Sequence, residues 1–184
     1  MNNKVKNTLK NIGVNFPIDY NVTNLVDILI CDNIKKYKKG LKTSLNIYKN
    51  FKFDTLIFKI DFDYNQTEEE NLENTINILN RFIDICKLKK PTFMKYTNYD
   101  NTIEGILFCW DLSKEKIKIK NLIKEILFLN NDGFIELFSS VFFLDTNKHI
   151  LFNFYSDKII KILYTNNKDL NKIYKKYKKI IITT

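Results

Sequence analysis

The sequence is poor in the residues that usually mark tight turns and active sites. Its 184 residues include 4 glycines, 2 prolines and a single histidine, His149. It therefore contains no Walker loop, no GxSxG nucleophile motif, no GxGxxG dinucleotide motif and no HExxH zinc motif. These absences exclude the enzyme classes that such motifs define, and we expect a protein that is not an enzyme.

Cysteine and long apolar runs are scarce as well. Cys31, Cys86 and Cys109 lie far apart and form no CxxC pair, so the sequence predicts no metal site, and reduced cysteines suit a reducing cytosol. The segment 1–10 lacks the apolar region of a signal peptide, and no apolar run approaches the roughly 18 residues of a membrane span. We expect a cytoplasmic protein with no membrane partner and no cofactor.

The charged residues are mostly of one type. The net charge is +9, yet Arg81 is the only arginine among 30 basic residues. Isoleucine, lysine and asparagine make up 81 of the 184 residues, and their A/T-rich codons indicate a biased genome. A basic surplus fits a nucleic acid, an acidic membrane or an acidic protein. Because nucleic-acid-binding proteins favour arginine for bidentate contacts, we favour genome bias over a dedicated nucleic-acid surface.

Hydrophobic periodicity predicts both helices and strands. Leu9 and Ile12 fit a short helix that ends near Gly13, and the segment 25–31 fits either a strand or a helical turn. The clearer helices are expected at 34–50, 67–88, 116–130 and 167–180, and the strands at 54–62, 92–97, 103–112, 137–144, 150–155 and 159–164. The fold class is α+β, with a mixed, largely antiparallel sheet of about five to six strands and about three to four helices packed on it. Without a linker or a repeat, 1–184 is expected to form one domain, of which 1–30 is weakly patterned.

The helix expected at 67–88 has the strongest local signals. Thr67 and Glu70 form a capping box, and Pro91 follows the expected end. Its buried stripe is expected to contain Leu72, Ile76, Leu79, Phe82, Ile83 and Cys86.

The order of these segments resembles a bacterial family of unknown function. The resemblance lies mainly in 117–181 and rests on the segments NLIKEILFLNND, VFFLD, ILFNFYSDK and DLNKIYKKYKKII. The hallmark of that family is a C-terminal Tyr-Asp-Asp-Arg-Gly box, which here reads Tyr155-Ser156-Asp157-Lys158-Ile159. The first aspartate and the glycine are lost and lysine replaces arginine. The resemblance implies a fold, points away from an enzyme and is in keeping with binding or immunity modules.

Two polar groups are candidates for chemistry. His149 lies in an expected hairpin turn within reach of Asp145, although an exposed turn is a poor catalytic site. Asp61 and Asp63 end a strand after Lys59 and precede the acidic run 68–70, as the carboxylates of a metal-dependent nuclease would. Acids at a strand end and in the first turn of a helix also occur for solvation and for the helix dipole, and we favour that interpretation.

The candidate partner-binding residues lie near the C-terminus. One face of the last helix carries lysines, and Tyr155, Asp157 and Lys158 either form a structural ion pair or edge a binding site. The lysines are Lys168, Lys172, Lys175, Lys176 and Lys179.

These observations favour a small, non-enzymatic binding protein that inhibits a macromolecular partner. The expected type is an immunity protein or an anti-defence, anti-CRISPR-like inhibitor, and the expected partner is a toxin or a defence effector nuclease. A lysine-rich nucleic-acid-binding domain is the alternative, followed by a metal-dependent nuclease.

Overall fold

The structure is a computed structural model that describes residues 3–14, 24–30, 37–97, 100–128, 140–155, 158–166, 168 and 170–182. In these residues the helices are α1 (Asn3–Ile12), α2 (Tyr37–Tyr48), α3 (Glu68–Cys86), α4 (Ile119–Phe128), α5 (Asn171–Tyr177) and the 3-10 helix η4 (Lys178–Ile180). The strands are β1 (Leu25–Leu29), β2 (Thr55–Asp61), β3 (Thr92–Thr97), β4 (Ile103–Asp111), β5 (Val141–Asp145), β6 (Ile150–Phe154), β7 (Ile159–Tyr164) and β8 (Ile181–Ile182).

The strands form one sheet in the order β3-β4-β2-β5-β6-β7-β1-β8. Every neighbouring pair is antiparallel. The α+β class is therefore confirmed, whereas the expected five to six strands and three to four helices are too few for the eight strands and five α-helices of the described residues. Two strands escaped the prediction because β8 has only two residues and because the pattern of β1 fits a helical turn equally well.

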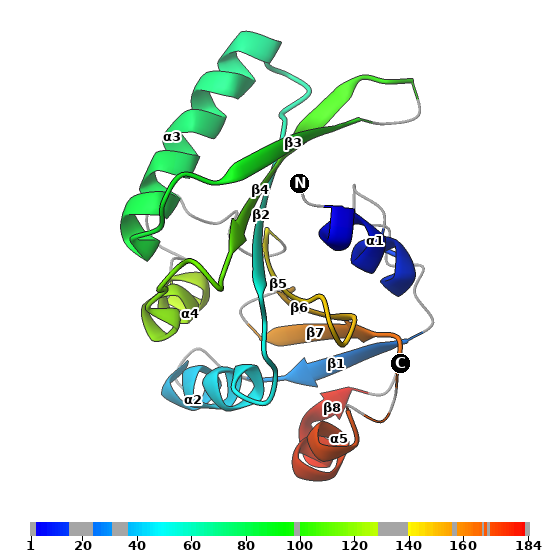
Figure 1. Ribbon diagram of the computed structural model, residues 1–184. Coiled ribbons are helices and arrows are strands. Elements are labelled where there is room, and N and C mark those ends of the chain that lie inside the picture. Colours follow the sequence, from blue (N-terminus) through cyan, green and yellow to red (C-terminus); the bar gives the residue numbers. More distant parts are fainter. Residues whose placement is uncertain are drawn as a thin grey trace.

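Helices cover both faces of the sheet, as Figure 1 shows. On one face lie α2, α3 and α4, with α5 beside the β8 edge, and on the other face lies α1. Two buried clusters match these two layers, the larger between the sheet and α2–α5 and the smaller between the sheet and α1. A central sheet with a buried cluster on each face explains why β5 and β6 are apolar at nearly every position.

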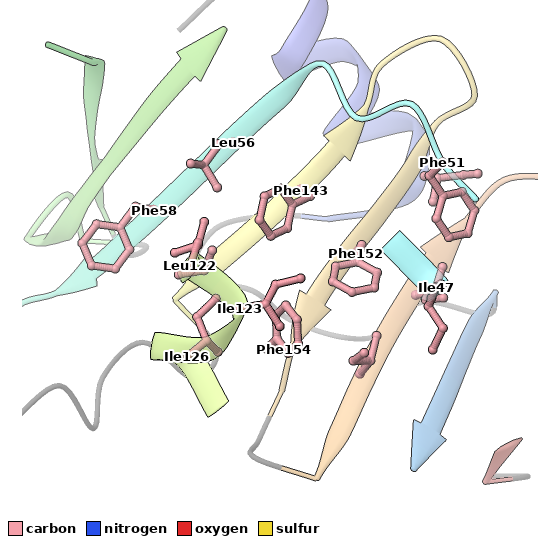
Figure 2. Close-up of a cluster of buried hydrophobic side chains, with 14 of the residues drawn as sticks. Ile47, Phe51, Leu56, Phe58, Leu122, Ile123, Ile126, Phe143, Phe152 and Phe154 are labelled. Atoms are coloured by element: carbon pink, nitrogen blue, oxygen red, sulfur yellow. The ribbon is translucent and has the colours of Figure 1, made fainter. Parts of the chain in front are cut away.

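The larger cluster is built from aromatic side chains of the strands and aliphatic side chains of the helices. In Figure 2, Phe143 of β5 and Phe154 of β6 lie on the side of Leu122 and Ile123 of α4, whereas Phe152 lies beside Ile47 of α2. Farther along the sheet, the ring of Phe82 stacks on Phe58 with centroids 4.1 Å apart and lies 5.3 Å from the ring of Trp110. Trp110 is 2% exposed and donates its indole N–H to the carbonyl oxygen of Lys89 at 2.7 Å.

Helix α3 begins where the capping box predicts. The Thr67 hydroxyl accepts the N–H of Glu70, and the Glu70 carboxylate accepts the N–H of Thr67 at 2.8 Å. The expected buried stripe is wrong at Ile76, which is 56% exposed, while Asn71 and Thr75 are buried. Asn71 faces inward because its amide bonds the backbone of the preceding loop, including both the N–H and the carbonyl oxygen of Asp63.

Helix α1 ends in a Schellman motif at Gly13, so the expected end of this short helix is confirmed. Gly13 has a φ of 80°, and its N–H donates to the carbonyl oxygen of Lys10. The N–H of Val14 donates to the carbonyl oxygen of Leu9 at 2.9 Å. Because glycine adopts this left-handed conformation without a steric cost, the position of Gly13 sets the end of the helix.

Candidate functional site

A hollow of about 780 Å³ lies at the C-terminal end of β2. Asp61, Asp63 and Glu68 line it together with Glu104 of β4. The sequence singles out Asp61, Asp63 and Glu68 but not Glu104, and the fold brings the strand end and the first turn of α3 to one place. The hollow is therefore the main candidate for a catalytic or metal-binding site.

Three side chains of β2 and β3 form a compact polar group beside this hollow. The Lys59 ammonium and the Tyr96 hydroxyl both donate to the carboxylate of Asp61. The Lys59 nitrogen also lies 5.6 Å from the centroid of the Tyr96 ring. Burial raises the pKa of Tyr96, and its hydrogen bond to Asp61 raises it further, so the hydroxyl stays protonated and serves as a donor.

Gly105 makes room for this tyrosine. Gly105 of β4 lies opposite Tyr96 on one side and Asp61 on the other. A Cβ atom at Gly105 would lie 2.2 Å from the Ile60 carbonyl oxygen and 2.2 Å from the Tyr96 hydroxyl oxygen. The small residue in β4 is thus required by the ring that lies over it.

Asp63 and Glu68 of the hollow, and Glu70 in the same first turn of α3, are engaged in local structure. Asp63 accepts the N–H of Asn65 at 2.8 Å, and Glu68 forms an ion pair with Lys95 at 3.2 Å. Hydrogen bonds from the backbone and hydroxyl of Thr67 lower the pKa of Glu70. Among the described residues, no three His, Cys, Asp or Glu side chains are placed to hold a metal ion.

The sequence does not predict a buried ion pair that joins the neighbouring strands β1 and β7. Lys161 of β7 donates to both carboxylate oxygens of Asp27 of β1, at 2.9 and 3.1 Å. Both side chains are about one-tenth exposed, at 11% and 10%. The Lys161 nitrogen also lies 4.3 Å from the centroid of the Tyr155 ring. Tyr155 is a predicted site residue, and its ring lies next to Lys161 of this ion pair. The local sequence around Tyr155 gives no sign of the pair.

The segment Tyr155–Ile159 connects β6 to β7. The N–H of Tyr155 donates to the carbonyl oxygen of Ile159 at 3.0 Å. Lys158 is exposed, and its carbonyl oxygen accepts the N–H of Ile30 at 2.8 Å. Asp157 lies outside the described residues, so the expected pair between Asp157 and Lys158 stays a prediction. The described part of this segment therefore joins β6, β7 and the end of β1.

The predicted lysines form an exposed surface near the C-terminus. The last helix is shorter than the expected 167–180, because α5 ends at Tyr177 and η4 follows it. Leu170, Ile173 and Tyr177 are buried, so the lysines of these helices face solvent. The exposed lysines of this segment are Lys168, Lys172, Lys175, Lys176, Lys178 and Lys179.

Helix α2 adds further lysines to the same end of the molecule. Lys38, Lys39 and Lys42 are exposed, and in Figure 1 both helices lie in the lower part of the molecule, α2 on one face of the sheet and α5 beside β8. Neither α2 nor α5 nor η4 contains an acidic residue. We call the exposed lysines of these three helices the basic end: Lys38, Lys39, Lys42, Lys172, Lys175, Lys176, Lys178 and Lys179.

His149 has a structural place in the hairpin between β5 and β6. It is half-buried and adopts a φ of 53°. Asp145 is 1% exposed, and its carboxylate accepts the N–H groups of Asn147 and Lys148 at 3.1 and 3.0 Å. The hairpin is confirmed, and the Asp145 carboxylate, considered as a partner of His149, holds the turn.

These features define a domain built on a single antiparallel sheet. Several of its polar side chains bond to neighbouring strands and turns. The chain belongs to the family described as Domain of unknown function (DUF3885), whose model matches residues 24–184. The resemblance to a family of unknown function is thereby confirmed. The match includes every described helix and strand except α1. Neither the curated proteins nor the solved structures contain a match. Within the described residues, the helices are too short or too polar to span a membrane.

Proposed function

We propose that this domain is a non-enzymatic binding protein that inhibits a partner protein by covering an acidic surface. The proposal rests on the basic end, in which three helices carry exposed lysines and no acids. The kind of inhibitor is an immunity protein or an anti-defence, anti-CRISPR-like protein. The partner is then a toxin or a defence effector nuclease in the cytoplasm.

The ion pairs and protonation of the ionisable side chains support binding over catalysis. Asp61 is held between Lys59 and Tyr96, and Asp27 is held by Lys161. Burial raises the pKa of the Cys86 thiol to about 12 and that of Cys109 to about 11. A thiol with so high a pKa is protonated at neutral pH and is a poor nucleophile.

Exposed apolar side chains near the lysines favour a protein as the partner. Tyr174 of α5 and Ile182 of β8 are both 39% exposed. Interfaces between proteins typically combine such anchors with a polar rim, whose charges steer the encounter. Helices α2, α5 and η4 contain no arginine, so this surface lacks the planar fork that arginine presents to phosphates.

The test is capture of a partner from host lysate by the intact chain. Changing Lys172, Lys175 and Lys179 to glutamate reverses the charge of the basic end, and we expect at least about a tenfold loss of the captured protein. Lys6, Lys10 and Lys90 are exposed lysines on other elements, so their change to glutamate is the matched control and should preserve capture.

Three results would contradict the proposal. They are the absence of a stable partner, equal capture by the two variants, or an acid-free surface on the captured protein. Binding of DNA or RNA that falls steeply with salt and is lost only in the first variant would instead establish the nucleic-acid alternative.

A further inference from the structure

Strand β3 forms one edge of the sheet, and β8 forms the other (Figure 1). Proteins usually protect such edges with a very short strand, a proline, a bulge or a charge. Strand β8 has only two residues, whereas β3 has six. The one irregularity of register between β3 and β4 falls at the end of the strand, between Tyr96 and Thr97. Strand β3 therefore presents a regular edge from Thr92 to Tyr96.

Two residues of β3 direct their backbone groups away from the sheet. Bonded residues alternate along an antiparallel strand, so each residue of β4 faces either β2 or β3. The N–H of Leu112, just beyond β4, donates to the carbonyl oxygen of Asp54, so the even-numbered residues of β4 face β2 and the odd-numbered ones face β3. Those odd-numbered residues lie opposite the even-numbered residues of β3. The N–H and carbonyl groups of Phe93 and Lys95 therefore point outwards, and no hydrogen bond within the described residues uses them.

The side chains of Phe93 and Lys95 lie on the same side of the strand, because they are two residues apart. Phe93 is 63% exposed, although its ring lies 6.4 Å from that of Phe108 in β4. Lys95 is the one charged residue of β3, and its ammonium pairs with the Glu68 carboxylate of α3 at 3.2 Å. The positive charge that would keep two such edges apart is therefore balanced within each chain.

We propose that β3 pairs with β3 of a second copy of this chain, so that two sheets join into one across a two-fold axis. In the antiparallel register centred on Met94, Phe93 of each copy lies opposite Lys95 of the other. These residues then exchange both their N–H and their carbonyl groups across the axis. The apolar stem of Lys95 covers the exposed ring of Phe93, while its ammonium stays beside Glu68.

A second copy fits this edge because the edge is complementary to itself. The two residues with outward backbone groups lie equally far from Met94, so a single rotation satisfies all of these groups. The same rotation sets each lysine against an aromatic ring instead of against the other lysine, which avoids like charges in a cross-strand pair. The basic end lies on α2, α5 and η4, and β3 is not part of it. The pairing is therefore independent of the proposed function.

Hydrogen exchange of the wild-type full chain tests the pairing. As the protein concentration rises from micromolar to millimolar, exchange at the amides of Phe93 and Lys95 should slow, whereas Met94 already bonds to β4 and should change little. Sedimentation velocity over the same range should show a monomer becoming a dimer. A chain that stays monomeric, or unchanged exchange at Phe93 and Lys95, would overturn the proposal. Slowing that requires an unrelated protein would also overturn it, because that protein would then be the occupant.

Two substitutions at one position separate the backbone from the side chain. Lys95→Pro removes the outward N–H and leaves the bonds between β3 and β4 in place, since an edge strand tolerates proline where its N–H faces solvent. Lys95→Ala is the matched control, because it removes the same side chain and keeps the N–H. We expect the dimer of the proline variant to be at least about tenfold weaker than that of the alanine variant.

Equal dimerisation of the two variants would place the contact elsewhere and would overturn pairing through β3. Circular dichroism checks that both variants are folded. The exchange measurement uses the wild-type chain alone, so it decides the question if the proline variant does not fold.

Discussion

At the scale of single residues, Gly105 is a tightly constrained position. It is the point at which the ring of Tyr96, the carbonyl oxygen of Ile60 and strand β4 meet. The Tyr96 hydroxyl bonds Asp61, and Asp61 pairs with Lys59, so the whole polar group at the end of β2 depends on the space above this glycine.

We predict that Gly105→Ala destabilises the fold by about 1–3 kcal/mol, as overpacking of a buried site does. The added methyl group meets backbone at Ile60, which cannot move without disturbing the pairing of β2 with β4. Urea denaturation measures the change. Tyr96→Phe is the comparison, because it keeps the ring and removes only the hydroxyl, and it should cost less. An unchanged urea midpoint for Gly105→Ala would contradict the close approach.

At the scale of elements, the start of α3 is the most locally determined feature. Thr67 and Glu70 satisfy two backbone N–H groups of the first turn reciprocally. The same turn lies beside the hollow at the end of β2, so the cap positions Glu68, which pairs with Lys95 of β3.

Removing the capping hydroxyl should therefore weaken this end of the helix. We predict that Thr67→Ala lowers the stability of the protein by about 1 kcal/mol, whereas Thr67→Ser keeps the hydroxyl and stays near the wild type. Urea denaturation gives the difference, and amide hydrogen exchange at residues 68–71 should be faster in the alanine variant alone. Equal stability of the two variants would show that the hydroxyl contributes nothing.

At the scale of the whole molecule, buried tyrosines couple folding to alkaline pH. Burial raises the pKa of Tyr48 to about 12, and burial together with a hydrogen bond to Tyr174 raises the pKa of Tyr164 to about 12. Burial raises the pKa of Tyr96 as well. An unfolded tyrosine loses its proton at about pH 10. The stabilisation is therefore complete below pH 10 and is lost as the pH rises towards the folded-state values.

We predict a lower urea midpoint at pH 11 than at pH 8. The net charge passes through zero at the pI of about 9.3 and is negative at pH 11, so charge repulsion also changes over this range and a variant is needed to isolate the tyrosines. Tyr48→Phe removes one of these groups and should reduce the difference between the two pH values. The same difference in this variant and in the wild type would exclude Tyr48 as a contributor.

Features that depend on neighbouring residues were predictable from the sequence. The strands at 92–97 and 159–164 were expected at the bounds the structure has, and the capping box at Thr67 and the helix end at Gly13 were read from a few adjacent side chains. The exposed lysines of the last helix also follow from its periodicity. Each of these signals lies within one or two turns of chain, so no knowledge of distant residues is needed.

Contacts between distant residues become visible only in the folded chain. Asp27 and Lys161 are separated by 134 positions, and each lies in an apolar strand that gives no sign of a charged partner. The burial of Asn71 in place of Ile76 depends on the loop that packs against α3, and the two-residue β8 is a strand only because β1 lies beside it. The covering of the sheet by α1 is of the same kind. Strand pairing and the burial of one face depend on contacts between segments that are distant in the sequence. Because each segment supplies only one side of such a contact, its own sequence does not determine the outcome.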